Sequence, residues 1–162
     1  MMKTRISVLC VFATLVLCAA SAVAAPPATS YKSTASITSL GPGSNVCPSN
    51  QFPVSVAGNG IDLFGNYTLT EQLCADPVTG AFEGQFEITH KGEGSYSGVF
   101  NGTFFPSGEL LEVHATWRIL GGSGAFSHLL GAGTGKGTAT VVNGGPGPGT
   151  LLLDGSILIP DE

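Results

Sequence analysis

Positive charge is scarce in this sequence of 162 residues, which holds six Lys and Arg residues against eleven Asp and Glu residues. Two of the six, Lys3 and Arg5, lie at the extreme N-terminus. Without residues 1–24, four basic residues remain against eleven acidic ones, which gives a formal charge of −7. Such a chain repels a phosphate backbone, because nucleic-acid binding depends on neutralising phosphates with Lys and Arg. Nucleic acid and anionic lipid are therefore not expected as partners.

A second long apolar run is also missing. The run that is present, Ile6 to Ala20, carries no charge and is shorter than the about 20 residues that span a bilayer. It follows a basic N-terminus and precedes the small residues Ser21 to Ala24, which is the order of a secretory signal peptide. We predict cleavage after Ala24; the alternative, a lipoprotein signal ending at Cys18, lacks the small residue that should precede the cysteine. The mature chain is therefore expected to be secreted, to the periplasm or outside the cell, without membrane insertion.

Closely spaced cysteines are absent as well. Cys10 and Cys18 leave with the signal peptide, so Cys47 and Cys74 remain as an even pair in an oxidising compartment, which predicts one disulfide bond. The alternative, a pair of metal-binding or redox thiols, lacks a C-x-x-C spacing and a histidine nearby in the sequence. The three histidines match no short metal motif, and we expect no metal. The glycine-rich stretch around Lys136 runs into a β-branched segment rather than the helix that a phosphate loop requires, so no cofactor is expected.

Helix-forming runs are missing, and short alternating segments take their place. All 24 glycines lie beyond residue 24, and Gly, Pro and Asn-Gly separate the segments. The pattern predicts eight strands, at residues 33–40, 52–57, 66–74, 82–90, 94–105, 109–119, 134–143 and 150–159. Short hairpin connections favour an all-β fold, an eight-stranded antiparallel up-and-down barrel, and a β-sandwich fits the same pattern. We expect a flexible lead-in at residues 25–32 and a single barrel domain at residues 33–162.

The sixth predicted strand has an apolar face and a polar face, and the polar face carries Glu112, His114 and Arg118. If that face lined a cavity, His114 would transfer a proton, with Glu112 setting its tautomer and Arg118 binding an oxyanion. These three residues are therefore the candidate catalytic group. The alternation favours the other interpretation, in which the polar face is the solvated outside of the sheet. The remaining histidines, His90 and His128, are predicted to lie at the surface.

Aromatic residues recur at strand spacing through the middle of the chain. Five of them are candidates to line a ligand pocket: Phe86, Tyr96, Phe100, Phe104 and Trp117. Packing in the core is the default for aromatic residues in this pattern, and a small barrel is either filled or holds one small ligand. If the barrel is hollow, Tyr96 or Trp117 would supply an orienting hydrogen bond.

A strand that ends in a glycine-rich turn carries a resemblance to a known family. Residues 117–126 read Trp-Arg-Ile-Leu-Gly-Gly-Ser-Gly-Ala-Phe, and Gly-Ala-Gly-Thr-Gly follows at residues 131–135. Over roughly residues 60–157 the chain resembles the allene oxide cyclase and dirigent protein superfamily, including secreted bacterial members of unassigned function. In this motif Gly121, Gly122 and Gly124 permit a positive φ and close backbone approach. Phe126 is expected to plug the end of the barrel.

The resemblance implies an eight-stranded antiparallel barrel with a central cavity, often assembled as dimers or trimers. Allene oxide cyclases and dirigent proteins steer the cyclisation or coupling of a reactive small molecule inside the barrel, but their pocket residues do not align onto this chain. Three functions stay open at this point. The first is binding of a small apolar or aromatic molecule, the second is a cyclase or isomerase activity, and the third is a structural or interaction module with a filled barrel.

Overall fold

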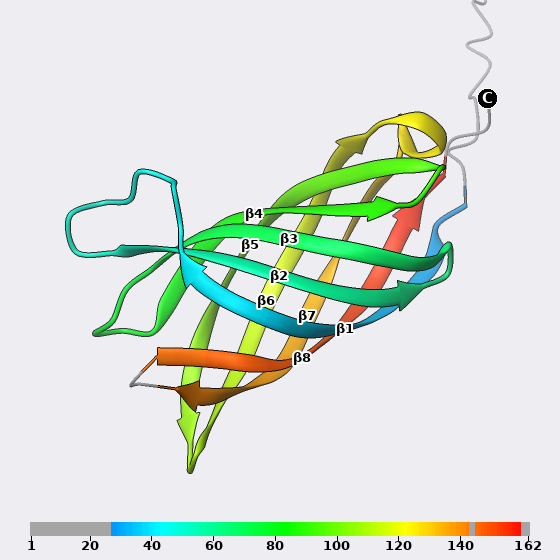
Figure 1. Cartoon of the computed structure of the whole chain (residues 1–162). Helices are drawn as coiled ribbons and strands as arrows, with labels where there is room; N and C mark the ends of the chain where they lie inside the picture. The colour runs from blue at the N-terminus through cyan, green and yellow to red at the C-terminus, as the bar shows by residue number, and fades with distance from the viewer. Residues whose placement is uncertain (1–26, 143–144, 160–162) are drawn as a thin grey trace, which may run out of the picture.

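The structure is a computed structural model that describes residues 27–142 and 145–159. Eight antiparallel strands follow one another around a closed barrel, and the last strand pairs with the first (Figure 1). The strands are β1 (Thr29–Pro42), β2 (Phe52–Asp62), β3 (Gly65–Ala75), β4 (Ala81–His90), β5 (Gly94–Ser107), β6 (Leu110–Gly122), β7 (Leu130–Val142) and β8 (Gly145–Leu158). This confirms the predicted up-and-down barrel and rules out the sandwich. The predicted signal peptide, residues 1–24, lies outside the described residues.

The barrel begins earlier in the chain than the sequence indicated. β1 starts at Thr29, and its first half pairs with β8 from Thr29 to Ile37. Tyr31 is 1% exposed, so its side chain belongs to the core. The flexible lead-in predicted for residues 25–32 is therefore wrong from Thr29 onward. The pairing with β8 supplies the order, because backbone groups on both strands satisfy one another in the ladder.

Glycines on the inner face make room for aromatic rings. A Cβ atom added at Gly98 would lie 2.6 Å from the ring of Phe86, and one added at Gly102 would lie 2.5 Å from the ring of Phe82. Both glycines are on β5, and both phenylalanines face them from β4. Each ring thus fills the space that a side chain on the neighbouring strand would take, which is how a narrow barrel accommodates bulky residues.

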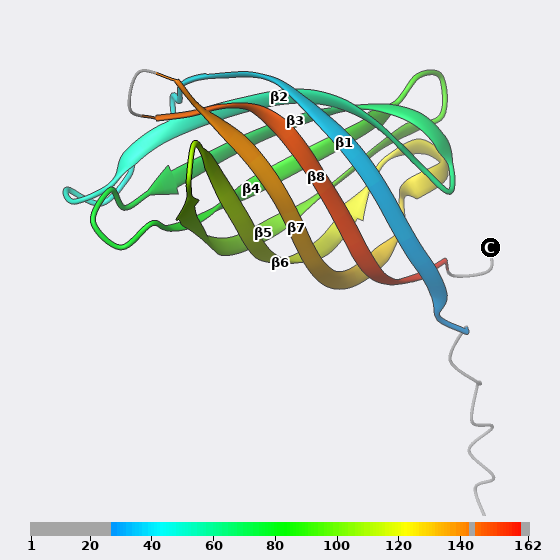
Figure 2. The ribbon, with the colours of Figure 1, turned by 90° about the horizontal axis from the view of Figure 1, so that it is seen from below.

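A short turn of 3-10 helix, η1 (Gly124–Phe126), closes one end of the barrel between β6 and β7 (Figure 2). Phe126 is 3% exposed, and its ring centroid lies 5.0 Å from that of Phe64 and 5.4 Å from that of Tyr96. Gly121 and Gly124 have φ angles of 149° and 59°, where an L side chain would be strained. The turn motif therefore places an aromatic plug against the barrel interior.

The opposite end is bordered by the β1–β2, β3–β4 and β5–β6 connections, which lie at the left and lower left of Figure 1. A disulfide between Cys47 and Cys74 ties the β1–β2 loop to the end of β3, as predicted. The bond closes a loop of 27 residues. It is compatible with a location outside the cytoplasm, where disulfides persist. Within the described ranges, no helix has the length and hydrophobicity to cross a membrane.

Candidate ligand-binding cavity

A cavity of about 320 Å³ occupies the end of the barrel opposite η1. Side chains from all eight strands line it, and most of them are aliphatic or aromatic. Its volume is at the lower end of the roughly 300–1,000 Å³ that is usual for small-molecule sites. The barrel is therefore hollow at one end and packed at the other.

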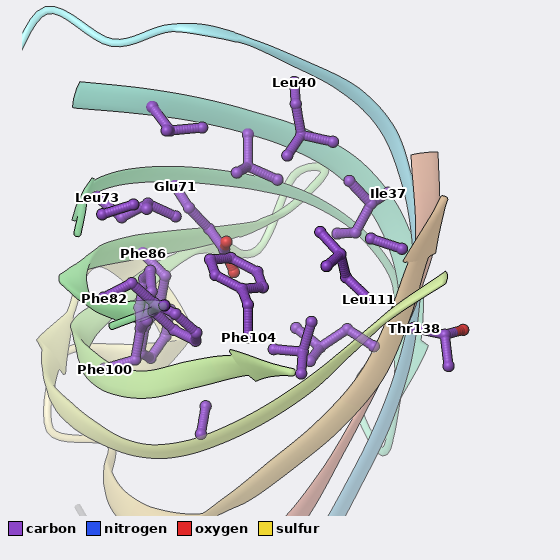
Figure 3. A pocket seen from close by; sticks show the side chains of 18 of the residues that line it. Ile37, Leu40, Glu71, Leu73, Phe82, Phe86, Phe100, Phe104, Leu111 and Thr138 are labelled. Carbon is purple, nitrogen blue, oxygen red and sulfur yellow. The ribbon is translucent and has the colours of Figure 1, made fainter. Parts of the chain in front are cut away.

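The aromatic side of the cavity is formed by four phenylalanines on two neighbouring strands. Phe82 and Phe86 come from β4, and Phe100 and Phe104 come from β5 (Figure 3). The ring centroids of Phe82 and Phe104 are 4.5 Å apart, and those of Phe82 and Phe100 are 5.9 Å apart. Three of the predicted pocket residues, Phe86, Phe100 and Phe104, thus lie on one wall.

Trp117 also lines the cavity, but its polar atom is already used. The indole Nε1 donates a hydrogen bond to the backbone carbonyl of Thr134 at 3.0 Å. The ring can therefore contact a ligand through its apolar surface, while the hydrogen bond expected from it to a ligand is ruled out in this arrangement. Because the chain has a single tryptophan, Trp117 is also a specific fluorescent reporter of the cavity.

One carboxyl group projects into this apolar space. Glu71 lies on β3 between Leu69 and Leu73, which line the same cavity. Figure 3 shows the Glu71 carboxyl pointing into this space. Its cross-strand neighbours are Val56 on β2 and Phe86 on β4. Desolvation by burial raises the pKa of Glu71 from 4.5 to about 7, and no neighbouring charge or hydrogen bond offsets that effect. The carboxyl is thus poised to gain or lose a proton near neutral pH.

Sequence reasoning missed Glu71, although the sequence carries a signal for it. In β3 the inward residues alternate with outward ones, and Tyr67, Leu69 and Leu73 are all buried. A glutamate at position 71 shares their face, so it interrupts an apolar stripe. An acidic residue at such a position lacks the solvent that the alternating pattern gives to outward residues.

A second carboxyl, that of Asp76, lies at the rim of the cavity, where β3 ends. It accepts hydrogen bonds from the backbone N–H groups of Val78 at 2.8 Å and Thr79 at 3.2 Å. These bonds hold the pKa of Asp76 below its ordinary value. Asp76 and Glu71 are the two ionisable residues among the described residues that line the cavity, and both are acidic.

Tyr96 does not line the cavity, which corrects its prediction as a pocket residue. Its hydroxyl donates to Oδ2 of Asp62 at 2.7 Å and lies 2.8 Å from the hydroxyl of Tyr31, which also donates to Asp62. These contacts hold Tyr96 in a buried cluster near η1, at the end of the barrel opposite the cavity. Burial, followed by the proximity of Tyr31, raises the pKa of the Tyr96 hydroxyl far above its ordinary value.

His90 belongs to the same cluster, so its prediction as a surface residue is wrong. The residue is 3% exposed, and its Nε2 lies 3.3 Å from Oδ2 of Asp62. Its ring is stacked near Tyr96 and tilted against Phe126, with centroid distances of 6.0 Å and 5.1 Å. Because His90 and Tyr96 are buried and their rings pack against each other and against Phe126, this cluster fills the barrel next to η1.

The candidate catalytic group Glu112, His114 and Arg118 lies on the outside of β6. His114 and Glu112 have side chains 51% and 50% exposed, and Nε2 of His114 lies 3.8 Å from Oε2 of Glu112. The interpretation that these residues line a cavity is therefore wrong, because strand alternation turns them to solvent and Val113, Ala115 and Trp117 inward. His128 is exposed in the loop after η1.

Comparison with known proteins yields no match: no protein-family model, no curated protein and no solved structure is similar to the chain. The resemblance to allene oxide cyclases and dirigent proteins therefore stays a hypothesis that depends on the glycine-rich motif. Among residues 27–142 and 145–159, no three His, Cys, Asp or Glu side chains cluster as ligands of a metal ion would. The geometry of the cavity is the basis for a functional proposal.

Proposed function

We propose that this protein is a secreted barrel that binds one small, predominantly apolar molecule in the cavity opposite η1. The observation that carries the proposal is the cavity of about 320 Å³, which is lined by apolar side chains from all eight strands. A ligand in it would be surrounded by protein on most sides, and its affinity would come from apolar surface removed from water. A filled structural barrel accounts less well for this space, since interiors without a ligand are close-packed.

Secretion is part of the proposal. The basic N-terminus, the apolar run and the small residues before Ala25 have the order of a cleavable signal peptide. The Cys47–Cys74 disulfide supports export, because such bonds persist mainly in oxidising compartments. Membership of the allene oxide cyclase and dirigent-like barrels is proposed on the glycine-rich turn together with the eight-stranded antiparallel barrel.

A cyclase or isomerase is the second candidate function, and one observation favours it. The carboxyl of Glu71, with a pKa of about 7, lies in a largely apolar cavity. A general acid or base works best when its pKa is close to the working pH. Turnover of a reactive substrate that is lost in Glu71→Gln but kept in Glu71→Asp would favour the enzyme over the binding protein.

The binding proposal is tested by titrating the mature protein with 1-octanol and following Trp117 fluorescence. We expect saturable binding to the wild type, loss of binding when Val113→Phe fills the cavity, and unchanged binding when Thr116→Phe adds the same ring on the outer face of β6. Equal binding by the two variants would place octanol outside the barrel. If the wild type and the two variants behave as expected, native mass spectrometry of protein purified from its own host would identify a natural ligand by its mass.

A further inference from the structure

Among the described residues, those that line the cavity include two acidic groups and no basic one. Glu71 lies inside and Asp76 at the rim, and no Lys or Arg is among the described residues that line the space. The four basic residues beyond the signal peptide, Lys32, Lys91, Arg118 and Lys136, are all exposed. An anionic ligand such as a fatty acid would therefore meet like charge at the rim and again inside, with no cation to receive its head group.

Within the part of the chain that the structure describes, the Glu71 carboxyl makes no hydrogen bond and no ion pair, and desolvation is the cause of its raised pKa. Its cross-strand neighbours Val56 and Phe86 are apolar and buried, and its neighbours along the inner face are Leu69 and Leu73. A buried carboxylate is ordinarily paired with a cation or bonded to several donors. Asp62 at the other end of the same interior follows that rule, because two tyrosine hydroxyls donate to it. Glu71, which is partly buried, has no such partner among the described residues, so its carboxyl group is free to receive a ligand.

The aromatic wall favours the same kind of partner. Phe82, Phe86, Phe100 and Phe104 line the cavity into which the Glu71 carboxyl projects (Figure 3). The face of an aromatic ring is the negative end of its quadrupole and attracts cations, most strongly when water is excluded. A positively charged head group would thus gain from the carboxylate and from the rings around it, while the apolar body would fill the rest of the space.

We infer that the ligand of this cavity is a small apolar amine, bound as its cation with the ammonium group against the Glu71 carboxylate. The inference depends on the proposed function and adds the chemical class of the ligand. Formation of the ion pair keeps Glu71 ionised at neutral pH, so the charge that is costly in the empty cavity is compensated in the occupied one.

Three probes with the same apolar chain separate the inference from the proposed function. Octylamine, 1-octanol and octanoate are titrated at pH 7.5 against the mature protein, with Trp117 fluorescence and calorimetry as readouts. We expect octylamine to bind about tenfold or more tightly than octanol, which is the usual gain from a charge-assisted hydrogen bond, and octanoate to bind more weakly than octanol. This order requires no variant, so it remains informative if a substitution disturbs folding.

Glu71→Gln tests the carboxylate itself, because it keeps the shape of the side chain and removes its charge. The variant should bind octylamine and octanol within about twofold of each other. Glu87→Gln is the matched control: it removes the same charge from the exposed outer face of β4, one residue beyond the cross-strand neighbour of Glu71, and should keep the wild-type preference.

Each outcome decides a different claim. Octanol binding without a preference for octylamine would overturn the amine inference and leave the apolar-ligand proposal standing. A preference for octylamine that persists in Glu71→Gln would also overturn it, since the carboxylate would not be the receiving group. Failure of all three probes to bind the wild type would overturn the proposed function, and the amine inference with it.

Discussion

Replacement of Glu71 by glutamine should change the pH dependence of folding stability in a specific direction. Burial raises the pKa of Glu71 from 4.5 to about 7 in the folded protein. The folded state therefore holds this proton more tightly than the unfolded state does. The stabilising effect is complete below about pH 4.5 and is lost as the pH rises through 7, so ionised Glu71 destabilises the ligand-free barrel at alkaline pH.

The magnitude follows from the size of the pKa shift. A change of one pKa unit corresponds to about 1.4 kcal/mol, so a shift from 4.5 to about 7 corresponds to about 3 kcal/mol. Glutamine has no charge to desolvate and should escape this cost. The free energy of unfolding of Glu71→Gln relative to the wild type should therefore rise by about 3 kcal/mol between pH 4 and pH 9.

Urea unfolding, followed by the fluorescence of buried Trp117, measures this difference at each pH. Other titrating groups affect the wild type and the variant alike, so subtracting one curve from the other isolates position 71. Glu87→Gln, on the exposed face of β4, should give a difference that is nearly independent of pH. If the difference for Glu71→Gln were equally flat, Glu71 would be solvated or paired, and the basis of the amine inference would fail.

Three further predictions concern the barrel itself. Reduction of the Cys47–Cys74 disulfide should lower the free energy of unfolding by about 3.5 kcal/mol, as the closure entropy of its 27-residue loop implies; urea midpoints with and without reductant measure it. Phe126→Ala should cost about 3–5 kcal/mol because it empties the packed end, and an unchanged melting temperature would show that η1 does not plug the barrel. Gly98→Ala should destabilise the barrel severely, since its Cβ would lie 2.1 Å from the backbone oxygen of Arg118, whereas Ser97→Ala on the exposed face of β5 should change the urea midpoint little.

The sequence predicted the barrel because its strands alternate clearly where one face is apolar. β6 is the best example: Val113, Ala115 and Trp117 face inward, and the residues between them face solvent. The start of β1 was missed because Tyr31 and Ser33, both buried, alternate with Lys and Thr in a segment of low hydrophobicity. This segment forms a strand because it pairs with β8, and local sequence patterns do not indicate a contact between opposite ends of the chain.

The sequence predicted the phenylalanines of the cavity but not its polar residues, because contacts between polar residues depend on the register between strands. Phe86, Phe100 and Phe104 were placed in the cavity by period alone, since large apolar residues on an inner face must lie in the interior. Whether a polar residue on the inner face lies in the cavity or in a buried cluster depends on which residues of the other strands contact it. His90 and Tyr96 meet Asp62 only because β2, β4 and β5 bring their ends together, so no spacing within one strand indicates that cluster.

The two interior carboxyls have different surroundings at the two ends of the barrel, and this contrast supports the proposed site at Glu71. Near η1, Asp62 accepts hydrogen bonds from the hydroxyls of Tyr31 and Tyr96, and Nε2 of His90 lies 3.3 Å from it without making a hydrogen bond. At the opposite end, the Glu71 side chain projects into the cavity among apolar side chains. Leucine at position 71 would continue the stripe of Leu69 and Leu73 without the cost of desolvating a carboxyl group. Under the proposed function, the interaction that compensates Glu71 forms after folding, when a ligand enters the cavity.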